Sequence, residues 1–279
     1  MKIIADCGAT SSDWRVIHDN GSITSYAEAG INASAMLPEY IRKIISGIGK
    51  KISVTDDSAA EIYLYMAGLP SLELHQEIKN IFSSCFPVKN IDIQNDLIAA
   101  ARAVWGCKPG IVAILGTGSN SCQWDGSQPV KRVYSSGFIL GDEGSGATLG
   151  KVFISDFLKG LVPETIASDF SSRYPSDYDT IIKNVYKSET SPSGYLGSFA
   201  PFIIGHYDNP YIKELVDGNF RAFFRRCICQ YDTDRYSVGI VGGFGHALKD
   251  TITRIASESG ISISDFVKTP IDRLVEYHR

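Results

Sequence analysis

A pattern of strand, small polar loop, strand, Asx-Gly turn and strand occurs twice in this chain. It is found in KIIADCGATSSDWRVIHDNGSITSY, residues 2–26, and again in GIVAILGTGSNSCQWDGSQPVKRVY, residues 110–134. The Asn20-Gly21 and Asp125-Gly126 pairs are typical of hairpin turns, because both central positions of such a turn favour positive φ. The repeat therefore predicts two structural units that each open with three consecutive strands.

Further elements are expected after each set of three strands. Apolar spacing predicts helices at about 38–48 and 71–85 and a helix beginning at Asp96, with short strands at 61–68 and 90–94. The second half adds a mainly helical region from about 161 to 235 and another strand before GGFG. These alternating elements predict an α/β fold, and 279 residues that are 44% hydrophobic can fill two cores.

The domain boundaries follow from this order of elements. The expected N-terminal lobe covers residues 1–106, and the expected C-terminal lobe, with its helical insertion, covers residues 107–264. An amphipathic helix at about 265–279 is predicted to pack back on the first lobe.

Composition and charge limit the kinds of molecule that this protein is expected to bind. The net charge is -4 and no block of basic residues stands out, which argues against nucleic acid and against a membrane surface. No apolar run approaches the roughly 20 residues that span a bilayer, and a strand begins directly after Met1 and Lys2. We therefore expect a cytoplasmic protein. The dispersed cysteines and histidines do not have the spacing of a zinc site.

Three glycine-rich loops, DCGATSS, GTGSNS and GGFG, each follow an apolar strand. Backbone N–H groups and hydroxyls in such loops can hold an anion, and two of them could hold a polyphosphate. A tight turn is the simpler explanation for one loop alone. Asp6 ends a strand and Asp96 opens a helix. Asp6 is either a strand-end turn residue or a ligand of a hard cation, and Asp96 is either an N-cap or a general base.

This arrangement resembles the sugar kinase, heat-shock ATPase and actin superfamily. The match is nearest to its N-acetylglucosamine kinase branch, which includes the BadF/BadG/BcrA/BcrD-type ATPases. DCGATSSDW is similar to the first phosphate motif, GTGSNS to the second, GDEGSGATLGK to the connecting motif and VGGFGHAL to the adenosine motif. The C-terminal TPIDRLVEYH also resembles this group. The resemblance implies two ribonuclease-H-like lobes with ATP in an interlobe cleft, and phosphorylation of N-acetylglucosamine or a related amino sugar.

The resemblance also implies a role for individual residues. Asp6 would hold Mg²⁺ and Asp96 would be the catalytic base and contact the sugar. Two sets of residues complete the site. Those implied to bind ATP are Gly8, Ala9, Thr10, Ser11, Gly116, Thr117, Gly118, Gly242 and Gly243. Those implied to bind the amino sugar are Asn32, Ser119, Asn120 and Asp142, together with Asp96.

The chain departs from the family pattern in three places. Relatives often carry Lys at the position of Ser11, the usual GWG stretch reads SSGF here, and a usual Gly is Arg273. Two alternative functions stay open: a BadF-type ATPase that activates a dehydratase, and a non-catalytic sugar sensor. The first would use cysteines for an iron–sulfur cluster and a GGQD stretch, where this chain reads IQND. A homodimer is a further expectation.

Overall fold

The computed structural model describes residues 1–8, 11–31, 36–52, 59–67, 72–85, 87–187 and 191–279. The chain divides into two compact units, one made of Met1–Gly106 with Thr269–Arg279 and the other of Cys107–Lys268. Within the described ranges, none of the helices combines the length and apolar character needed to cross a membrane.

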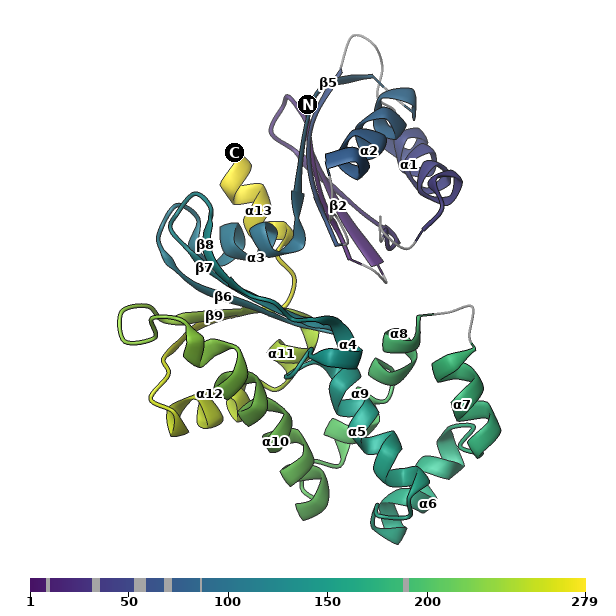
Figure 1. The fold of residues 1–279 in the computed structure, drawn as a ribbon. Helices are drawn as coiled ribbons and strands as arrows, with labels where there is room; N and C mark the ends of the chain where they lie inside the picture. The colour runs from purple at the N-terminus through teal and green to yellow at the C-terminus, as the bar shows by residue number, and fades with distance from the viewer. Residues whose placement is uncertain (9–10, 32–35, 53–58, 68–71, 86, 188–190) are drawn as a thin grey trace. The chain divides into compact units, whose positions relative to one another are not determined.

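The first unit is built on a five-stranded sheet in the order β3-β2-β1-β4-β5 (Figure 1). The strands are β1 (Lys2–Cys7), β2 (Ser11–Ile17), β3 (Ile23–Ala29), β4 (Ala60–Met66) and β5 (Val88–Asn95). The pairs β1–β2 and β2–β3 are antiparallel, whereas β4 runs parallel to both β1 and β5. The turn predicted around Asn20-Gly21 joins β2 to β3, where the His18 N–H donates to the Ser22 carbonyl at 2.9 Å.

Two helices cover each face of this sheet (Figure 1). They are α1 (Pro38–Ile52) and α2 (Leu72–Cys85) on one face, and α3 (Asp96–Trp105) and α13 (Ile271–His278) on the other. Because side chains alternate along a strand, Ile3 of β1 packs in the α1 and α2 core while Ile4 packs with α3 and α13. Asp6 shares the face of Ile4, so it lies on the side of the sheet that α3 covers.

The second unit repeats this topology with a sheet in the order β10-β9-β6-β7-β8. Its strands are β6 (Gly110–Leu115), β7 (Ser119–Trp124), β8 (Pro129–Val133), β9 (Val238–Val241) and β10 (Ile263–Val267). The first three are again antiparallel neighbours, and β9 is again parallel to the strand on either side of it. The repeat in the sequence therefore correctly predicted a repeated sheet.

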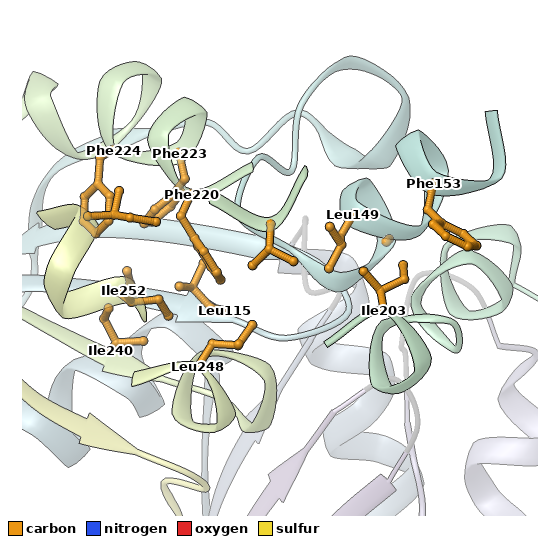
Figure 2. Packing of buried hydrophobic residues seen from close by; sticks show 14 of the residues in the cluster. Leu115, Leu149, Phe153, Ile203, Phe220, Phe223, Phe224, Ile240, Leu248 and Ile252 are labelled. Carbon is orange, nitrogen blue, oxygen red and sulfur yellow. The ribbon is translucent and has the colours of Figure 1, made fainter. Parts of the chain in front are cut away.

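Helices account for most of the rest of the second unit. They are α4 (Gly137–Leu140), α5 (Gly146–Leu158), α6 (Glu164–Arg173), α7 (Tyr178–Tyr186), α8 (Pro192–Gly197), α9 (Ala200–Gly205), α10 (Pro210–Arg226), α11 (Gly243–Ala247) and α12 (Lys249–Glu258), with a 3-10 turn η2 (Ile228–Gln230). Figure 2 shows how Phe220 of α10 and Ile252 of α12 pack against Leu115 of β6, while Leu149 of α5 meets Ile203 of α9. This core fixes the end of β6, from which the second glycine loop leaves.

The C-terminal prediction was partly wrong. Residues 263–267 form strand β10, which pairs with β9, and the last helix is α13, Ile271–His278, rather than 265–279. In the sequence ISDFV, the mixed polar and apolar residues carry little strand signal of their own. The strand forms because β9 offers a parallel partner.

A hydrogen-bonded cluster of Tyr65, Arg102 and His278 holds α13 in the first unit. Arg102 Nη1 donates to the Tyr65 hydroxyl at 2.8 Å, and that hydroxyl lies 2.7 Å from His278 Nε2. Because a guanidinium can only donate, the hydroxyl accepts from Arg102, and it can donate its own proton to Nε2 when the imidazole is neutral. Burial, with the positive charges of Arg102 and Lys2, lowers the pKa of His278 to about 4, although Asp92 acts in the opposite direction.

We expect this cluster to make stability depend on pH. The pKa of His278 is about 4 when folded and 6.5 in the reference state, so its contribution is complete above pH 6.5 and is lost as the pH falls towards 4. The loss is at most about 3 kcal/mol, reduced by solvent screening. His278→Gln keeps an acceptor for Tyr65 but does not titrate. Melting temperatures from pH 7 to 4 should fall more steeply for wild type than for this variant, and parallel curves would contradict the assignment.

Candidate active site

Asp6 is the centre of a group of carboxylates in the first unit. It lies one residue before the end of β1, and its partners across the sheet are Asp13 in β2 and Tyr65 in β4. Burial, followed by the negative charges of Asp96 and Asp13, raises the pKa of Asp6 to about 7. A carboxylate in such surroundings is stabilised by a proton or by a cation.

Asp96 is the first residue of α3 but not its cap. The N-cap is Asn95, whose side-chain oxygen accepts from the Ile98 N–H at 2.9 Å, so the interpretation of Asp96 as an N-cap is wrong. β1, β4 and β5 are parallel neighbours, and their carboxyl ends meet at one edge of the sheet. This topology brings Asp96, which directly follows β5, close enough to Asp6 to raise its pKa.

The first glycine loop is described only at its two ends. The Gly8 N–H donates to the Ser11 carbonyl at 3.0 Å, and the Gly8 carbonyl accepts from the Ile31 N–H at 3.0 Å. Ser11 is the first residue of β2 and is exposed. The predicted site residues Ala9, Thr10 and Asn32 lie outside the described residues.

The second glycine loop is shorter than predicted, because β7 already begins at Ser119. The loop is therefore Gly116–Gly118, and Ser119 and Asn120 are strand residues. It is tied to the start of α5 by the Gly146 N–H, which donates to the Gly116 carbonyl at 2.9 Å, and by the Ala147 N–H, which donates to the Thr117 carbonyl at 3.0 Å. These bonds fix the loop backbone from the helix side.

Asp142 lies directly against this loop. Its Oδ1 accepts from the Ser119 N–H at 3.3 Å, and a Cβ added to Gly118 would lie 3.2 Å from Oδ2. Asp142 is buried and has φ of 56°, a conformation that is uncommon outside glycine and often marks a functional residue. Burial raises the pKa of Asp142, while hydrogen bonds from Ser119 and Ser135 lower it. Gly118, which was predicted to bind ATP, therefore lies beside Ser119 and Asp142, which were predicted to bind the sugar.

A pocket of about 380 Å³ opens beside the second loop. We call it the glycine-lined pocket. Its lining comes from the second loop and α5, from α8 and α9, and from α11: Gly116, Thr117, Gly146, Gly197, Ala200, Pro201, Ile204, Gly243, Phe244 and Ala247. Gly242, which precedes α11, has φ of 123°, and a Cβ there would lie 2.4 Å from the Leu115 carbonyl oxygen. Only glycine fits at Gly242, whereas a Cβ on Gly243 would meet nothing within 4 Å.

The sequence did not point to several residues that build these surroundings. Asn219 of α10 accepts from the Gly144 N–H at 3.0 Å and donates to the Ser145 carbonyl at 3.1 Å, which holds the turn after Asp142. Arg226, also of α10, pairs with Glu143 of the connecting motif at 2.9 Å. The α8 and α9 residues of the glycine-lined pocket belong to no motif. The positions of these residues depend on tertiary packing, and no local sequence pattern predicts them.

The carboxylates of the first unit fit a hard cation. Magnesium takes oxygen ligands and usually keeps several waters, with only one or two carboxylates. Among the residues that the structure describes, no three His, Cys, Asp or Glu side chains converge to hold a metal. Asp6, with its raised pKa and with Asp96 nearby, suits an ion bound mainly through water and phosphate oxygens.

The two sheets of equal order, each with a glycine loop after its first strand, define an actin-like ATPase fold, so the predicted fold class is confirmed. A solved structure of a proposed N-acetylglucosamine kinase from Porphyromonas gingivalis is 31% identical, with a TM-score of 0.91 over 100% of this chain and 98% of that chain. The chain therefore belongs to the N-acetylglucosamine kinase-like family of this superfamily. No family model and no curated protein sequence matches it.

Two more distant structures share the fold. A proposed N-acetylglucosamine kinase from Chromobacterium violaceum has a TM-score of 0.79 at 17% identity, over 100% of this chain and 98% of that chain. A ROK family glucokinase from Streptomyces griseus, in complex with glucose and AMPPNP, has a TM-score of 0.57 at 15% identity, over 99% and 97% of the two chains. At these identities the likeness concerns the fold alone.

Proposed function

We propose that this protein transfers the terminal phosphoryl group of ATP to a hydroxyl of an amino sugar, and that the acceptor is N-acetylglucosamine. The reaction class is supported by the family, since the Porphyromonas gingivalis relative is a proposed kinase of this sugar. A glucokinase of the same fold binds glucose and AMPPNP. The identity of the acceptor as an amino sugar is a more specific proposal than the reaction class.

The observation that carries the proposal is the placement of Asp6, near the end of β1, and Asp96, directly after β5, at one edge of the first sheet. The charge of Asp96 there helps to raise the pKa of Asp6. Phosphoryl transfer depends mainly on positioning and on charge neutralisation. Bound Mg²⁺, held by Asp6, would supply that neutralisation at the phosphates. Asp96 would orient the sugar hydroxyl and accept its proton, and α3 holds this residue in place without needing it as a cap.

The remaining roles are assigned to loops that follow strands and to residues beside these loops. Gly8, Ala9, Thr10 and Ser11 in the first unit and Gly116, Thr117 and Gly118 in the second would bind the phosphates through N–H groups and hydroxyls. Gly242 and Gly243 would lie against the nucleoside. Asn32, Ser119, Asn120 and Asp142 would bind the sugar hydroxyls and the acetamido group.

A coupled ADP-release assay with a panel of sugars tests this proposal. N-acetylglucosamine should give the highest kcat/KM, ahead of N-acetylgalactosamine, N-acetylmannosamine and glucose. Thermal-shift measurements with AMPPNP, Mg²⁺ and each sugar should rank the ligands in the same order, since a ligand that binds only the folded state stabilises it. Activity with glucose alone would contradict the amino-sugar assignment, and the absence of turnover with every sugar would contradict the kinase assignment.

Asp142→Asn is expected to lower kcat/KM for the sugar by about 10- to 100-fold, because a hydrogen bond to a charged group contributes about 1.5–3 kcal/mol. Asparagine tolerates positive φ, so the melting temperature should stay close to that of wild type. Asp125→Asn is the matched control, because Asp125 lies in an exposed turn where its Oδ1 accepts from the Ser127 and Gln128 N–H groups. Equal sugar KM values for the two variants would remove Asp142 from the sugar site.

A further inference from the structure

The glycine-lined pocket is almost free of side chains that can form hydrogen bonds. Among the described residues that line it, four are glycines, and the others apart from Thr117 are Ala200, Pro201, Ile204, Phe244 and Ala247. The Thr117 hydroxyl is therefore the only side-chain donor or acceptor in this lining. Under the proposed function, Thr117 belongs to the phosphate loop, so its hydroxyl is directed to phosphate rather than to the base.

Many backbone groups of the lining already have partners inside the second unit. The Gly116 N–H donates to the Gly118 carbonyl, the Gly116 carbonyl accepts from the Gly146 N–H, and the Thr117 carbonyl accepts from the Ala147 N–H. On the α9 side, the Ile204 carbonyl accepts from the Tyr207 N–H at 3.2 Å, and Pro201 has no N–H to offer. The Gly116 N–H therefore cannot donate to a base without giving up an existing bond, and each of the three carbonyls already has one of its two lone pairs engaged.

We infer that the glycine-lined pocket holds a purine nucleoside by its apolar faces without distinguishing the edge groups of the base, so that GTP and ITP replace ATP as phosphoryl donors. This inference rests on the proposed function and extends it to the class of nucleotide. Adenine, guanine and hypoxanthine share one ring system and differ in their exocyclic and ring N–H groups. A pocket that contacts the ring faces treats them alike.

The expected size of the effect follows from the way binding sites discriminate. A site built to hydrogen-bond a substrate group rejects an analogue that lacks it by about 10⁴–10⁵-fold, whereas apolar contacts alone discriminate by about 10–200-fold for a change in size. Adenine and guanine differ little in ring size, so we expect affinities within about tenfold of each other. The smaller ring of a pyrimidine covers less of the apolar lining, so UTP should bind more weakly than either purine nucleotide.

The test is calorimetric titration of the full chain, with Mg²⁺ present, using AMPPNP and GMPPNP. Dissociation constants that differ by less than about tenfold, with kcat/KM for ATP and GTP in the same ratio, are the expected result. Gly243→Leu should weaken both analogues by the same factor, because its side chain enters the pocket that they share. GMPPNP binding that survives in this variant would overturn the inference, since the nucleotide would then be bound elsewhere.

The outcomes separate this inference from the proposed function. A more than tenfold preference for AMPPNP overturns the inference alone and leaves an ATP-dependent kinase. Binding of neither analogue overturns both. Binding of both analogues without turnover of any sugar contradicts the proposed kinase activity while supporting a pocket that does not read the base.

Discussion

Replacing Asp96 with asparagine is expected to lower kcat by about 10²–10⁴-fold and to leave nucleotide affinity and melting temperature close to wild type. A sugar hydroxyl is a poor nucleophile near neutral pH, and loss of a general base costs this factor in rate, or about 2.7–5.5 kcal/mol of transition-state stabilisation. Asparagine keeps the size of the side chain and much of its hydrogen bonding but cannot take a proton. Single-turnover measurements would place the loss in the chemical step.

The structure allows an effect of Asp96 on catalysis to be separated from an effect on helix capping. The side chain of Asn95, not of Asp96, caps α3, so a change at Asp96 does not remove the cap. Asn95→Ala is the matched variant one residue away: it should cost about 0.5–2 kcal/mol of stability with a much smaller effect on kcat than Asp96→Asn. A kcat for Asp96→Asn within a few-fold of wild type would end the mechanism as proposed.

The features that could be predicted from the sequence are those with a local signal. Asx-Gly pairs set the two hairpins, and alternating apolar residues such as those around Trp14 set the strands beside them. Because the same local pattern occurs twice, the two sheets could be expected to share an order, and they do. Asp96 at the start of α3 was predicted for the same reason, since a helix signal follows it at once.

The features that could not be predicted depend on partners far away in the sequence. Ser119 and Asn120 are small polar residues that read as loop, yet they pair with Leu115 and Ile114 of β6 and extend β7. The strand β10 forms on β9, and its own residues do not indicate it. The apolar side of the glycine-lined pocket comes from α8 and α9, about 80 residues after the loop that it faces. Only the folded chain brings these segments together.

Gly243→Leu is expected to lower nucleotide affinity by at least about 100-fold, or about 2.7 kcal/mol, without lowering the melting temperature. Gly243 is the first residue of α11, is exposed and lines the glycine-lined pocket. A Cβ there would meet nothing within 4 Å, so the protein itself accommodates the new side chain. Leucine is also a better helix former than glycine. The bound nucleoside, in contrast, would have to share a pocket of about 380 Å³ with a leucine side chain.

Gly218→Leu is the matched control, because Gly218 also lies in a helix, α10, with nothing within 4 Å of an added Cβ, and it is not among the residues of the glycine-lined pocket. Calorimetric titration with AMPPNP should show wild-type affinity for this variant and a loss only for Gly243→Leu. A loss at both positions would mean that the added bulk disturbs the unit as a whole. If Gly243→Leu bound AMPPNP as wild type does, the nucleoside could not occupy this pocket. The roles proposed for Gly242 and Gly243 would then be wrong.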